Sequence, residues 1–134
     1  MKKIMLVTLA LVTMAAFSLL VSCSGSGKTP ADISKSFIYS LEKGDVDAAY
    51  DLLNGTGEAT EEEMQKMKAF LGEGSKQIAE KKGIKSIEVV KETISEDGTK
   101  ADVTLKVTYG NGEEDESESV LRKTEEGWKI SIEK

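Results

Sequence analysis

Few residues in this chain have side chains suited to catalysis or metal binding. Its 134 residues include one cysteine, Cys23, and no histidine. A single cysteine cannot form an internal disulfide. Without histidine, the chain lacks the commonest general base and the commonest ligand of transition metals. The composition therefore excludes a zinc site of the usual Cys/His kind, and we predict no metal and no cofactor.

Cys23 stands at the end of an uncharged segment. Residues 4–21 follow a short basic start and contain no charged side chain. A segment of this length fits either a cleaved export signal or an uncleaved membrane anchor. It ends in Leu20-Val21-Ser22-Cys23, which resembles the lipobox of bacterial lipoproteins. That resemblance implies a diacylglyceryl group bound to Cys23 through a thioether, followed by cleavage before Cys23. The alternative is an ordinary thiol at the end of a transmembrane helix.

The lipobox resemblance divides the chain into three parts. We predict a lipoprotein signal peptide over residues 1–22, a flexible Gly/Ser tether over 23–29 and one domain over 30–134. Two or three acyl chains on Cys23 would hold the protein stably on a membrane. Ser24 is not an aspartate, which in many Gram-negative bacteria resembles sorting to the outer membrane. We therefore expect a cell-envelope protein that faces the periplasm if the source is Gram-negative.

The predicted mature part is strongly acidic. The whole chain has a net charge of -6, and removing the two lysines of residues 1–22 lowers it to -8. Such a charge repels phosphate backbones, so we predict no nucleic-acid partner. It also argues against binding flat on an anionic membrane.

Two groups of polar residues could form sites. The acidic run at residues 113–118 (EEDESE) suggests calcium, but a strand points alternate side chains in opposite directions. A solvated hairpin arm is therefore the favoured interpretation. The tyrosines Tyr39, Tyr50 and Tyr109 could transfer protons beside a buried aspartate, but the sequence identifies no such pair, and we interpret them as core or rim residues.

The first half of the predicted domain has the periodicity of helices. We predict a helix over residues 31–43, a second one capped by Asp45, and a third that begins at Thr60. Thr60 and Glu63 have the spacing of a capping box. Gly72 and Gly74 interrupt the third helix, so we expect a kink or a break there.

The second half has the alternation of strands. The predicted strands cover residues 84–94, 101–109, 114–123 and 128–132. Asn111-Gly112 is a strong signal for a tight hairpin between the second and third of them. The sequence therefore predicts an α+β fold, with N-terminal helices packed on a curved four-stranded antiparallel sheet.

Two segments carry a resemblance to a known family. Residues 37–53 (FIYSLEKGDVDAAYDLL) and the closing 127–130 (GWKI) look like small lipoproteins of the nuclear-transport-factor-2-like (cystatin-like) superfamily. More narrowly, they are similar to lumazine-binding-like domains of unknown function. The resemblance covers residues 29–133 and implies a cone-shaped sheet that often holds a pocket. Some relatives are enzymes and many are binding or accessory domains, and no catalytic motif can be transferred to this chain.

We predict that apolar side chains line such a pocket, since methionine fills irregular apolar spaces. The candidates are Met64, Met67, Phe70, Val103, Leu105, Tyr109, Trp128 and Ile130. The favoured function is a non-catalytic, lipid-anchored accessory or binding domain that takes a small apolar ligand or a protein partner. The alternatives are a small cone-fold enzyme acting on an apolar metabolite, and a protein-binding subunit or inhibitor in an envelope complex. Self-association through an open sheet face is a further expectation.

Overall fold

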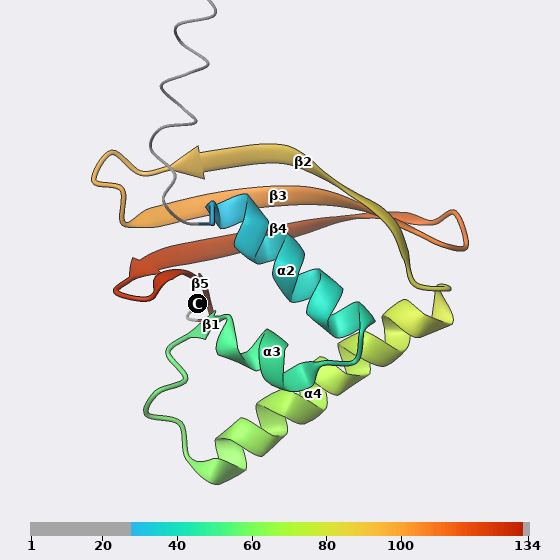
Figure 1. The fold of residues 1–134 in the computed structure, drawn as a ribbon, viewed down its shortest axis with the longest axis horizontal. Helices are drawn as coiled ribbons and strands as arrows, with labels where there is room; N and C mark the ends of the chain where they lie inside the picture. Colours follow the sequence, from blue (N-terminus) through green and yellow to red (C-terminus); the bar gives the residue numbers. More distant parts are fainter. Residues whose placement is uncertain (1–27, 133–134) are drawn as a thin grey trace, which may run out of the picture.

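The computed structural model describes residues 28–132, which form three helices and one mixed five-stranded sheet (Figure 1). The helices are α2 (Pro30–Glu42), α3 (Val46–Asp51) and α4 (Glu61–Glu80). The strands are β1 (Leu53–Asn54), β2 (Ile84–Ile94), β3 (Lys100–Tyr109), β4 (Glu114–Thr124) and β5 (Gly127–Ser131). The α+β class is confirmed. The predicted signal peptide, Cys23 and most of the tether lie outside the described residues.

Short polar side chains begin each helix. Thr29 and Asp32 form a capping box at α2, and the Asp45 carboxylate accepts a hydrogen bond from the Ala48 N–H at α3. At α4 the predicted capping box of Thr60 and Glu63 is confirmed, because each side chain accepts a hydrogen bond from the other residue's backbone N–H. These bonds satisfy donors that the first turn of a helix leaves without partners.

The predicted break in the third helix is wrong. α4 runs from Glu61 to Glu80 as one α-helix through both glycines. Each glycine costs about 1 kcal/mol relative to alanine. Burial of Leu71 and Ile78 on either side of them offsets that cost and keeps the helix continuous.

The antiparallel order of β2 to β5 follows the prediction, but the sheet has a fifth strand. β1 pairs in parallel with β5, placing Leu53 beside Ile130 and Asn54 beside Ser131. The prediction of four purely antiparallel strands is therefore wrong. A two-residue strand shows no alternation in the sequence, and β1 forms because the turn after α3 brings the buried Leu53 to the edge of β5.

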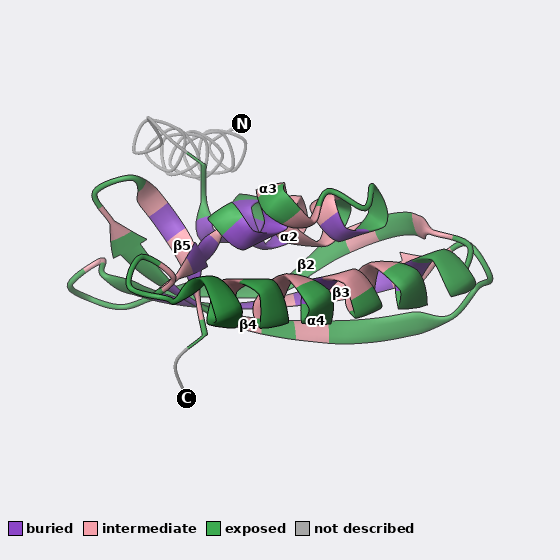
Figure 2. Ribbon diagram, turned by 90° about the horizontal axis from the view of Figure 1, so that it is seen from below, coloured by how far each residue is buried: buried purple, intermediate pink, exposed green. Residues whose placement is uncertain are grey.

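The core lies between α2 and the helix-facing side of the sheet. Buried residues gather where α2 and α3 face the strands, whereas much of α4 is exposed (Figure 2). On β3, the buried side chains are Ala101, Val103, Leu105 and Val107. Two glutamates also hold α2 to β2: the Glu92 carboxylate accepts from the Ala31 N–H at 2.8 Å, and the Glu42 carboxylate accepts from the Ile84 N–H at 2.7 Å.

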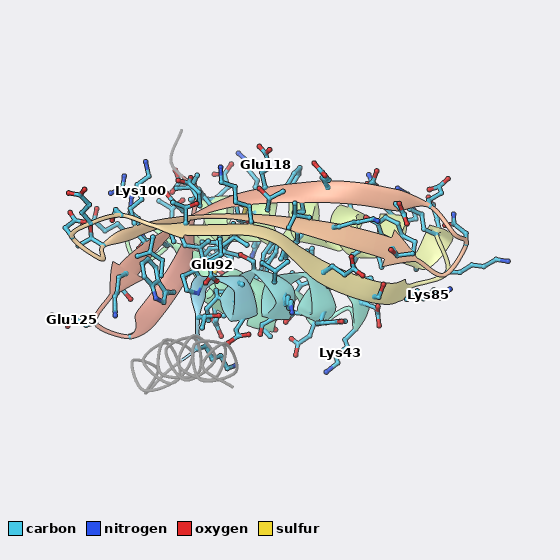
Figure 3. All side chains as sticks on the ribbon, turned by 90° about the horizontal axis from the view of Figure 1, so that it is seen from above. Lys43, Lys85, Glu92, Lys100, Glu118 and Glu125 are labelled. Atoms are coloured by element: carbon cyan, nitrogen blue, oxygen red, sulfur yellow. The ribbon has the colours of Figure 1, made fainter. Side chains whose placement is uncertain are left out.

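The opposite side of the sheet is polar. Figure 3 shows Lys100 and Glu118 on the side of the sheet away from the helices and Glu92 on the helix side. Within residues 28–132, no helix has both the length and the apolar character needed to cross a bilayer.

Candidate functional site

An open groove lies between the first half of α4, the loop before it and the residue that follows β5. Its volume is about 770 Å³. The side chains that line it come from α3, the loop 55–59, α4 and the end of the described chain: Tyr50, Gly55, Thr56, Glu58, Ala59, Glu63, Lys66, Met67, Phe70 and Ile132. Apolar side chains are therefore combined here with a charged rim.

Two large apolar side chains in the groove face solvent. Phe70 is 73 % exposed and Ile132 is 41 % exposed. Exposing a phenylalanine to water is unfavourable, and exposed apolar side chains that share one hollow indicate a contact surface. Gly55 leaves space beside Ile132, since a Cβ at this glycine would lie 3.9 Å from the Ile132 side chain.

The deeper part of the groove rests on the core. Tyr50 is buried in α3, and Met67 packs against the core cluster from α4. Lys68 lies 5.3 Å above the Tyr50 ring and forms an ion pair of 2.6 Å with Asp47. The hydrogen bond that Lys68 donates to the Asp47 carboxylate raises the pKa of Lys68, so this ammonium stays charged. These contacts tie α3 to α4 and fix the Tyr50 side of the groove.

The charged rim is already engaged in bonds that stabilise the fold. The Glu63 carboxylate accepts hydrogen bonds from the Thr60 N–H at 2.9 Å and the Thr60 hydroxyl at 3.2 Å. These bonds lower the pKa of Glu63, so it is ionised at neutral pH. Lys66 pairs with Glu62 at 2.8 Å on the exposed face of α4. A general acid or base needs a pKa near the working pH, and Glu63 is shifted away from it.

The structure separates the eight predicted pocket residues. Met67 and Phe70 line the groove. Val103, Leu105, Trp128 and Ile130 are buried in the core cluster, and Met64 and Tyr109 pack against it. The prediction placed the pocket inside the curve of the sheet, where α2 instead packs against the strands.

Several groove residues were not anticipated from the sequence. Ile132 continues the alternation of Trp128 and Ile130, which predicts an inward side chain, yet it follows the last residue of β5 and is exposed. Tyr50, Gly55 and Thr56 become neighbours of α4 through the turn that forms β1. No sequence signal marks that turn as part of a site.

A second polar cluster joins the end of α4 to the β3–β4 hairpin. Lys81 Nζ lies 2.9 Å from Asp115 and 3.4 Å from Glu113, and 4.5 Å above the Tyr109 ring. Burial raises the pKa of Tyr109; the Lys81 ammonium opposes this rise, and the Asp115 carboxylate adds to it. Asp115 is more than half exposed and forms an ion pair with Lys81. We therefore interpret its contact with Tyr109 as structural and not as a proton-transfer site.

The acidic run therefore lies along a strand, as predicted. Its even-numbered glutamates are on the outer side of the sheet, where Glu114 forms an ion pair with Lys106 at 3.4 Å. Among the described residues, no three acidic or cysteine side chains are placed together as a metal site would require.

Comparison with known sequence families gives one match. The sequence profile of a domain of unknown function, DUF4878, matches residues 21–131. This chain belongs to the DUF4878 family. The match covers all of the helices and strands described above. A comparison with curated proteins found no match.

Solved structures show which fold the DUF4878 chain has. It is similar to a nuclear-transport-factor-2-like protein from Campylobacter jejuni whose name proposes transpeptidase activity, with a TM-score of 0.68 at 21 % identity, over 79 % of this chain and 100 % of that one. A cystatin-fold protein from Novosphingobium aromaticivorans matches with a TM-score of 0.47 at 16 % identity, over 78 % and 97 % of the two chains. The epoxide hydrolase/cyclase-like enzyme SalBIII matches at 0.47 and 19 %, over 76 % and 85 %. The first of these confirms the predicted nuclear-transport-factor-2-like, cystatin-like fold.

Proposed function

We propose that this protein is a lipid-anchored binding domain of the bacterial cell envelope, and that the groove beside Phe70 holds its ligand. The observation that carries the proposal is the exposure of Phe70 and Ile132 in one groove of about 770 Å³. Pockets of this size accommodate small molecules or short chain segments, and mostly apolar walls favour an apolar ligand. The favoured ligand is therefore a small apolar molecule or an apolar segment of a partner protein.

The anchoring part of the proposal rests on the sequence before the domain. The uncharged residues 4–21 end in the lipobox-like Leu20–Cys23, and Gly and Ser residues follow. Acyl chains on Cys23 would hold the domain at a membrane, which is the outer membrane on its periplasmic side if the source is Gram-negative. The resemblance to lumazine-binding-like lipoprotein domains supports the same placement.

Binding is favoured over catalysis because of the residues in the groove. The chain has no histidine, and the groove's Glu63 is ionised and held by Thr60. A transpeptidase, the activity proposed in the name of the Campylobacter protein, needs an activated nucleophile. The groove's one hydroxyl besides that of Tyr50 belongs to Thr56, and among the described residues Lys66, the groove's one basic side chain, pairs with Glu62 and not with Thr56. A cone-fold enzyme or an inhibitor of an envelope complex is the second choice.

Photo-cross-linking in cells tests the groove. The full chain would carry the photoreactive analogue p-benzoylphenylalanine in place of Phe70, and its adduct would be identified by mass spectrometry. The matched control carries the same analogue at Tyr39, an exposed aromatic residue of α2 outside the groove. We expect one dominant adduct at position 70 that is absent at position 39. No adduct at 70, or the same adducts at both positions, would contradict the proposal.

Fatty-acid labelling tests the anchor separately. The full chain should incorporate a labelled fatty acid and fractionate with membranes, and Cys23→Ser should do neither. If the Cys23→Ser variant is labelled as strongly as the natural chain, Cys23 is not the attachment point.

A further inference from the structure

Strand β2 forms a long open edge of the sheet. It is last in the strand order, and within residues 28–132 it pairs with β3 alone. None of its eleven residues is buried. Val89, Val90 and Ile94 are 42 %, 54 % and 47 % exposed, and they make up three of the seven exposed large apolar side chains of the described chain. Because an open edge presents unpaired backbone N–H and C=O groups, it can accept another strand.

A bulge changes which side of the sheet the residues of β2 occupy. Val89 lies opposite Leu105, but Lys91 lies opposite Thr104, so Val90 is an extra residue. Before the bulge, Ile87 and Val89 share the helix-facing side with the buried residues of β3. After it, Glu92 and Ile94 occupy that side, opposite Val103 and Ala101.

This change makes β2 complementary to itself. When two copies of β2 pair antiparallel about a two-fold axis between Val89 and Val90, Glu88 of one copy lies opposite Lys91 of the other. In the β2–β3 register, Glu88 lies opposite Lys106 and Lys91 lies opposite Thr104. Both side chains are therefore on the outer side of the sheet. Opposite charges therefore meet twice, once on each side of an apolar centre formed by the four valines. Without the bulge, the same register would place Glu88 and Lys91 on opposite sides.

We propose that two copies of this chain associate by antiparallel pairing of their β2 edges, with Glu88 of each copy opposite Lys91 of the other. The pairing is isologous and closes after two copies, so it produces a dimer rather than a fibre. It joins two five-stranded sheets into one. Bulges and lysines on an edge commonly prevent pairing. On β2 the bulge instead favours the register in which Lys91 of each copy meets Glu88 of the other. This inference uses neither the groove nor the lipid anchor.

Cysteine cross-linking of the full chain in cells tests the edge. Val90→Cys would place two thiols next to the two-fold axis, within reach of a short bis-maleimide. The matched control is Val120→Cys, which puts the same substitution on an exposed valine of β4, away from the edge. The natural chain, with Cys23 alone, serves as the blank. We expect Val90→Cys to give a product of twice the chain mass and Val120→Cys to give little.

Charge reversal then tests the register in the Val90→Cys background. Glu88→Lys and Lys91→Glu each place like charges opposite each other at two positions, so each should lower the dimer fraction roughly tenfold. The double variant Glu88→Lys/Lys91→Glu should restore it. Equal cross-linking at positions 90 and 120, a product containing a different protein, or charge reversals without effect would each overturn the proposal.

Discussion

Gly110 lies where the β3–β4 hairpin contacts the end of α4, and a side chain there should be strongly destabilising. A Cβ at this position would lie 2.2 Å from the Lys82 carbonyl oxygen. That is closer than any Cβ contact that a folded protein tolerates, and the obstacle is backbone rather than a flexible side chain. Gly110→Ala must therefore separate the hairpin from the end of the helix.

The separation would break two backbone hydrogen bonds. The Gly110 N–H donates to the Gly83 carbonyl at 2.9 Å, and the Asn111 N–H donates to the Lys81 carbonyl at 3.0 Å. Each contributes about 1 kcal/mol. The free energy of unfolding should fall by about 2–3 kcal/mol in Gly110→Ala.

Urea unfolding followed by the fluorescence of Trp128, the one tryptophan, measures this change. Gly112→Ala is the control: it lies in the same hairpin with nothing within 4 Å of its Cβ, but its φ is +92°. Only the left-handed backbone should cost energy there, about 1–2 kcal/mol. If Gly110→Ala is as stable as the natural chain, or less destabilised than Gly112→Ala, the close contact between hairpin and helix does not exist.

Three further substitutions test other parts of the structure. Gly72→Ala should raise the free energy of unfolding by about 1 kcal/mol in the same urea assay. Gly72 lies inside the continuous helix α4, and a Cβ added there would have nothing within 4 Å. A loss of stability would indicate a kink at this position. Glu92→Ala should lower it by about 1–2 kcal/mol, because the buried Ala31 N–H loses its acceptor, whereas Glu92→Gln keeps an acceptor oxygen and should lose less; equal losses would contradict this role. Hydrogen bonds from Ser95 and Thr99 lower the pKa of Asp97 from 3.8 to about 2. The charged carboxylate therefore stabilises the fold fully above pH 3.8, and this stabilisation is lost as the pH falls through 2. Asp97→Asn should therefore be less stable than the natural chain at pH 6, and thermal unfolding should show the difference shrinking towards pH 2; a constant difference would show that the Asp97 charge is not involved.

The sequence predicts those elements whose signals are local. The capping box of Thr60 and Glu63, the cap at Asp45 and the Asn111-Gly112 hairpin all depend on residues within a few positions of each other. The alternation of β3 likewise predicts its buried side, because one side of the strand packs under α2.

The features that were missed depend on contacts between distant segments. β1 exists because Leu53 reaches Ile130, and α4 stays straight through its glycines because Leu71 and Ile78 are held by the core. The groove has the same origin: Met67 and Phe70 were foreseen as pocket residues, but Tyr50 and Ile132 join them only through the chain's path around β1 and β5. The core and the groove are both lined by apolar side chains. Periodicity alone therefore cannot distinguish a groove residue such as Phe70 from a core residue such as Leu105.

Native mass spectrometry tests most directly whether the groove holds a ligand. The core cluster lies between Ala31 and Ile130, so residues 24–134 purified from the bacterial host retain all of it. The account predicts an additional mass that stays bound under native conditions, leaves on denaturation and is absent from Phe70→Asp, whose charge would enter the apolar groove. If the natural chain and Phe70→Asp carry the same mass, or if neither carries one after extraction of the whole chain from cells as well, the groove is not a ligand site.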